Sequence, residues 1–122
     1  MTEDMKLEKF RSWVLDVLEL ISADPGRQVD YLHESRIGSD EILLQFDDVL
    51  HVAHARLRDG SMDQDDLHLL QEVDERVDAL NSEPASIWTE AALGEAAAWQ
   101  ELRIAAGRAK SELKKSWHWD FT

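Results

Sequence analysis

Apolar residues recur at intervals of three and four along most of the chain, and this spacing places them on one face of an α-helix. The first stripe, over residues 4–23, is made of Phe10, Trp13, Val14, Val17, Leu18 and Ile21. Asp24, Pro25 and Gly26 follow it. They are expected to end the helix, because proline cannot continue the hydrogen-bond ladder and glycine relaxes the turn.

A second long stripe begins after Ser39 and extends to Gly60. Ser39 is a candidate N-cap, and the acidic residues after it suit the positive end of a helix dipole. Gly60 is a favourable C-terminal stop. Between these two stripes, residues 27–38 suit a short helical turn, but the segment is too brief for periodicity to decide its conformation.

Asp63 is the candidate cap of a third helix, which carries Leu67, Leu70, Val73, Val77 and Leu80 inward. The short loop before it predicts that the second and third long helices are antiparallel neighbours. After a break at residues 81–84, one last helix is expected to start between Ala85 and Thr89 and to run to about Lys115. Gly94 and Gly107 within it indicate close packing or a slight bend.

Strand patterns are absent apart from the closing "WHWDFT", in which aromatic residues alternate. The patterns therefore predict an all-α fold. Residues 1–122 are expected to form a single domain, a bundle of four main antiparallel helices with one short extra helical turn.

Charge narrows the classes of partner. The chain has 26 acidic against 13 basic residues, a net charge of −13, and no cysteine. Such a field repels nucleic acids and anionic membranes and attracts basic proteins, although plain solubility also explains it. Neither a signal peptide nor a long apolar segment is found, so we expect a cytoplasmic protein with no nucleic-acid or membrane partner.

The stretch "FDDVLHVAH" carries Asp47, His51 and His54 within about 60° of one another on a helix. A metal needs three or four ligands, so other helices would have to supply the rest. A metal-binding enzyme or sensor using these residues is the alternative function, and an Asp47–His51 helix contact is the simpler interpretation. The sequence lacks a phosphate loop and a nucleophile elbow, so no cofactor and no enzymatic activity are expected.

The third helix is strongly acidic, and its outward half carries Asp65, Glu72, Glu75 and Asp78. A row of carboxylates can imitate a phosphate backbone and steer a basic partner, whereas a solvated helix face is the alternative. Adjacent carboxylates such as Asp65–Asp66 are expected to be solvated in an acidic chain.

The chain has five tryptophans. Trp13, Trp88 and Trp99 lie on apolar stripes and are expected in the core. Trp117 and Trp119 either fold back over the end of the bundle or form an exposed anchor, which leaves a homodimer open. Fold-back is favoured, because exposed paired tryptophans promote aggregation.

Three segments, "DEILLQFDDVL", "LHLLQEVDERVDAL" and "IWTEAALGEAAAWQELRIAAGRAKSEL", resemble a group of small acidic all-helical proteins from actinobacteria. The resemblance covers roughly residues 30–113, and its anchors are Phe46, Asp47, Asp48, Trp88, Leu93, Trp99 and Arg103. Some members of the group look like companions of secreted toxins, which implies an immunity role. His51 and His54 depart from the pattern, so the resemblance adds nothing to the metal alternative.

Together these observations predict a non-enzymatic acidic binding protein that sequesters a basic protein partner, with toxin neutralisation as the role that the resemblance implies. The expected partner-binding residues are Asp47, Asp48, Asp65, Glu72, Glu75 and Asp78.

Overall fold

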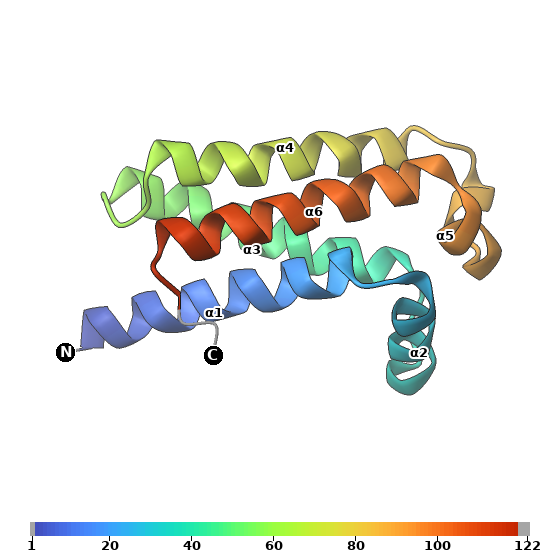
Figure 1. Cartoon of the computed structure of the whole chain (residues 1–122), viewed down its shortest axis with the longest axis horizontal. Coiled ribbons are helices and arrows are strands. Elements are labelled where there is room, and N and C mark those ends of the chain that lie inside the picture. The colour runs from blue at the N-terminus through green and yellow to red at the C-terminus, as the bar shows by residue number, and fades with distance from the viewer. Residues whose placement is uncertain (1, 120–122) are drawn as a thin grey trace.

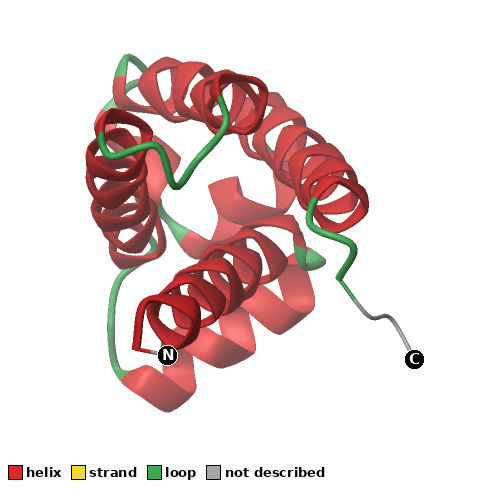
Figure 2. Cartoon of the chain, turned by 90° about the vertical axis from the view of Figure 1, so that its left-hand side faces the viewer, coloured by secondary structure: helices red, strands yellow, loops and turns green. Residues whose placement is uncertain are grey.

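The computed structural model describes residues 2–119, and this part of the chain consists of helices and loops without a strand (Figure 2). The prediction of an all-α fold is confirmed. In chain order the elements are α1 (Thr2–Ser22), α2 (Pro25–Ser35), α3 (Asp40–Arg58), α4 (Gln64–Asn81), the 3-10 helix η1 (Ala85–Trp88), α5 (Glu90–Glu95) and α6 (Ala97–Ser116). The described residues therefore hold more helices than the predicted four with one extra turn.

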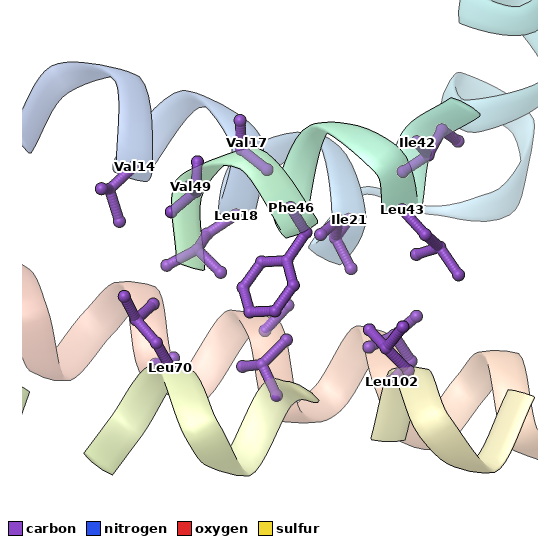
Figure 3. Packing of buried hydrophobic residues seen from close by; sticks show 14 of the residues in the cluster. Val14, Val17, Leu18, Ile21, Ile42, Leu43, Phe46, Val49, Leu70 and Leu102 are labelled. Carbon is purple, nitrogen blue, oxygen red and sulfur yellow. The ribbon is translucent and has the colours of Figure 1, made fainter. Parts of the chain in front are cut away.

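Four long helices enclose the core. α1 contacts α3 and α6, and α4 contacts the same two helices. Consecutive long helices point in opposite directions along the long axis of the molecule (Figure 1). Phe46 of α3 is fully buried, and Figure 3 shows its ring directed toward the side of the core where Leu70 of α4 lies.

The segment that the sequence left undecided is a helix, α2. Asp24 caps it, because its side chain accepts a hydrogen bond from the backbone N–H of Arg27 at 3.1 Å. Pro25 occupies the first turn, where a missing N–H costs nothing. The residues that end α1 therefore also begin α2, which ends at Arg36 with a φ of 58°.

A buried amide ties α2 to its neighbours. Gln28 is fully buried, and its Nε2 donates to the carbonyl oxygens of Leu20 at 3.0 Å and Ile21 at 2.8 Å, near the end of α1. Its Oε1 accepts from Nη1 of Arg103 in α6 at 3.0 Å. The same Nη1 donates to the carbonyl of Leu93 in α5 at 2.9 Å. Two side chains thus join α1, α2, α5 and α6.

The prediction of one continuous last helix is wrong, because the helix is interrupted at Ala96. This residue is extended, with φ −74° and ψ 135°, and it separates α5 from α6. Just before the interruption, Leu93 is fully buried, and its carbonyl oxygen accepts a hydrogen bond from the Arg103 guanidinium. Just after the interruption, Nε1 of the buried Trp99 donates a hydrogen bond to the carbonyl oxygen of Ile87 at 2.9 Å. Contacts between segments override the local helical pattern here.

At the opposite end, Trp117 folds back as expected. Its indole is 8% exposed and donates to Asp66 Oδ2 at 2.8 Å, while Ser116 Oγ donates to Asp66 Oδ1 at 2.8 Å. The Arg11 guanidinium lies 5.0 Å from the Trp117 ring centroid. Trp117 is therefore not an exposed anchor for a homodimer, and Asp66 is buried rather than solvated. Phe121 of the alternating tail lies outside the described residues.

Three further expectations need correction. Asp63 occupies the N-cap position of α4, but its side chain makes no capping hydrogen bond. Trp13 is 36% exposed and is not a core residue, because it lies at the edge of the buried face of α1. Its ring packs against that of Phe10, with 6.4 Å between the ring centroids. Ser39 occupies the N-cap position of α3 but makes no capping bond. Its hydroxyl donates instead to the carbonyl of Trp88 at 2.8 Å, which ties η1 to the start of α3.

The substitution Gln28→Ala is expected to lower the free energy of unfolding by about 2–3 kcal/mol, because a partly buried guanidinium and helix-end carbonyls lose a hydrogen-bond partner. Urea denaturation measures the change. The control Arg108→Ala, at an exposed position of α6, should stay within about 0.5 kcal/mol of the unsubstituted protein. Equal losses in both variants would contradict the assigned role of Gln28.

Ala97→Pro tests the interruption of the last helix. Ala97 is the exposed first residue of α6, and Ala96 before it already has the extended conformation that proline requires. We expect a change within about 0.5 kcal/mol. Ile104→Pro, at an exposed position inside α6, should cost about 3 kcal/mol. A continuous helix would make the two prolines similarly destabilising.

Candidate functional site

A groove of about 450 Å³ lies between α3 and α4, and Trp88 of η1 also lines it. Leu43, Leu44 and Val77 give it an apolar lining, and Leu44 is 47% exposed. Carboxylates also line it, namely Asp40 and Asp47, together with the amide of Asn81. Exposed apolar surface next to carboxylates suits a ligand that is both apolar and cationic.

Several carboxylates of α3 and α4 repel one another beside this groove, and Asp47 is the one among them that lines it. Burial raises the pKa of the Asp47 carboxyl, and repulsion from Asp48 and Asp78 raises it further. Burial likewise raises the pKa of Asp74, with added repulsion from Asp78 and Asp47 and a smaller opposing influence of His54. The charged groups that mainly shift the two pKa values are carboxylates and His54. The repulsion at Asp74 is therefore offset only in part, by the nearby His54.

The predicted partner-binding residues divide between two sides of α4. Asp78 of α4 is close enough to Asp47 of α3 to raise its pKa by repulsion, and Asp48 adjoins Asp47. Asp65 and Glu72 fall within about 40° of Arg76 on the helix. Arg76 reaches Glu101 of α6 at 3.3 Å, so those two acids lie toward α6.

The remaining residues complete this division. Glu75 is exposed and adds to the repulsion at Asp74. Asp74 itself was not among the predicted site residues. It lies only about 70° from the centre of the apolar face of α4, whereas the prediction took only outward positions. The predicted acidic row thus wraps around α4, and its half toward α3 lies near the groove, although the α4 residues that line the groove are Val77 and Asn81.

The metal-binding alternative requires several ligand side chains that lie close together in space. Within residues 2–119, no group of three or more His, Cys, Asp and Glu side chains is placed to hold a metal ion. His54 lowers the pKa of Asp74, and it is not among the groups that shift the pKa of Asp47. The predicted Asp47–His51 pair does not form an ion pair in the described structure either. The helix contact of this kind that does form joins His68 and Glu72 at 3.5 Å.

Comparisons of the chain with protein-family models, with curated proteins and with solved structures found no match. The likeness to small acidic actinobacterial proteins therefore stays a prediction based on the sequence segments alone. None of the helices in the described part of the chain combines the length and apolar character needed to cross a membrane.

Asp74→Asn should raise the melting temperature at pH 7 by roughly 2 °C, because it removes a carboxylate that is repelled and partly desolvated in the folded state. A raised folded-state pKa means that the unsubstituted protein gains stability as the pH falls through that pKa toward the ordinary value of 3.8. The gain from the substitution should therefore shrink in acid.

Thermal unfolding of both proteins at pH 7 and at about pH 3.5 measures this effect. Asp65→Asn is the matched control at an exposed position on the other side of α4, and no stabilisation is expected from it. A lower melting temperature for Asp74→Asn at pH 7 would mean that a cation neutralises Asp74, contrary to the described electrostatics.

Proposed function

We propose that this protein is a non-enzymatic binding protein that sequesters a basic protein partner in the groove between α3 and α4. The observation that carries the proposal is the group of carboxylates beside this groove, where repulsion among Asp47, Asp74 and Asp78 adds to burial in raising the pKa of Asp47 and of Asp74. A lysine or arginine of a partner placed among them would turn that repulsion into attraction.

The apolar lining defines the rest of the partner surface. Leu44 and Trp88 offer a place for an aliphatic or aromatic side chain next to the carboxylates. Interfaces commonly combine such an apolar centre with a charged rim. The partner surface is therefore expected to present basic residues beside an apolar one. The net charge of −13 would speed the encounter with it at low salt and disfavours nucleic acid as the occupant.

Toxin neutralisation is the biological form of this proposal that the sequence resemblance supports, with the basic partner as the toxin and this chain as its immunity protein in the cytoplasm. The proposal treats the four long helices as one antiparallel bundle. In such a frame α3 and α4 hold the carboxylates in place before the partner arrives, so little ordering is needed on binding.

Affinity capture from a lysate of the source organism, with stepwise salt elution, tests the proposal. Two immobilised variants are compared with the unsubstituted protein. The groove variant carries Asp47→Asn, Asp74→Asn and Asp78→Asn, and the control carries Asp65→Asn, Glu72→Gln and Glu75→Gln. Both variants lose the same formal charge. A basic protein held by the unsubstituted chain and by the control, released by salt and lost with the groove variant, is the expected result.

The other outcomes separate the alternatives. Loss of the partner from both variants would assign binding to the overall acidic field and not to the groove. Retention by both variants in equal amounts would show that the acidic surface of α3 and α4 is not the binding site. Loss from the control alone would move the site to the side of α4 toward α6.

A further inference from the structure

A second pocket, of about 530 Å³, opens between the later half of α1, one face of α2 and the start of α3. It shares no lining residue with the α3–α4 groove. Its size lies within the range of pockets that bind small molecules. Trp13, Leu20 and Tyr31 are among its lining residues, so an exposed aromatic surface is retained here instead of being covered by the core.

The two aromatic walls are held in place by neighbours. Phe10 meets Trp13 edge-on, with ring planes at 72° and centroids 6.4 Å apart. Tyr31 accepts a hydrogen bond on its hydroxyl from Nε2 of Gln45 in α3 at 2.9 Å. Both rings are therefore oriented before any ligand arrives, which lowers the entropic cost of binding.

Carboxylates line the pocket beside these rings, and most of them have no basic side chain as a partner. The negative charge of Glu19 is balanced by Lys110, which forms a hydrogen-bonded ion pair with it. This pair holds the pKa of Glu19 below its usual value, and Arg27 lowers it further. Arg27 is the cationic residue among those that line the pocket.

Three acids of the lining are different. Asp16, Asp30 and Glu34 line the same pocket. They make no hydrogen bond or ion pair through their side chains with any residue in the described part of the chain. Unpaired negative charge beside two fixed aromatic rings is the environment that favours an organic cation, through direct attraction and through cation–π contact.

We propose that the pocket between α1 and α2 binds a small organic ammonium ion. Its charged group lies near Asp16, Asp30 and Glu34 and over Trp13 or Tyr31, and its apolar body lies against Leu20. This site is distinct from the α3–α4 groove, because the two have no lining residue in common.

Benzyltrimethylammonium is the probe, and benzyl alcohol is the uncharged control with the same ring. The indole N–H signal of Trp13 is followed by ¹H–¹⁵N NMR during titration of the full chain. A saturable shift with a Kd below about 10 mM for the cation, and none for the alcohol, is expected.

Charge variants decide whether the assigned residues are responsible. The variant with Asp16→Asn, Asp30→Asn and Glu34→Gln should weaken binding at least about tenfold. These side chains are exposed, so the fold should persist. The variant with Asp47→Asn, Asp74→Asn and Asp78→Asn should bind the probe as the unsubstituted protein does. An absent or non-saturable shift, equal shifts with benzyl alcohol, or equal weakening by both variants would overturn the proposal.

Discussion

A buried amide has to satisfy two donors and an acceptor without water, and Gln28 does so by joining segments that are far apart in the sequence. Its donors fix the end of α1, and its acceptor fixes Arg103 of α6, whose Nη1 also fixes the end of α5 through Leu93. Burial lowers the pKa of the Arg103 guanidinium, which shows that this charge is taken partly out of water. The positions of α2 and α5, and with them one wall of the α1–α2 pocket, depend on this contact.

Periodicity predicted the long helices well, because each of them buries one apolar stripe. It failed where contacts between segments outweigh local preference. The helix α2 is short, and its cap at Asp24 had been assigned only to the end of α1. The interruption at Ala96 lies in an alanine-rich stretch with high helix propensity, and the nearby Gly94 indicated close packing or a slight bend but not a break. What decides the conformation there is a carbonyl at Leu93 that a distant arginine satisfies.

The candidate site was predicted in part for the same reason. A helical angle can be calculated for each residue, and it placed Asp47 and Asp78 correctly at the surface. The angular position of a residue on its own helix does not show which neighbouring helix that residue faces. The sequence therefore grouped Asp78 with Glu72, which lies toward α6, and overlooked Asp74, which lies toward α3. The apolar part of the groove depends on η1, which the sequence did not separate from the last helix.

The bond between Trp117 and Asp66 has a consequence for the order in which the chain folds during synthesis. Arg11 and Asp66 leave the ribosome long before residue 117, so at that stage neither has its partner from the later part of the chain. Closing this end of the core requires contacts between residues very distant in sequence, and such contacts form late. A nascent chain stalled before Trp117 would expose apolar surface near Arg11 of α1 and the start of α4 that Trp117 covers in the folded protein.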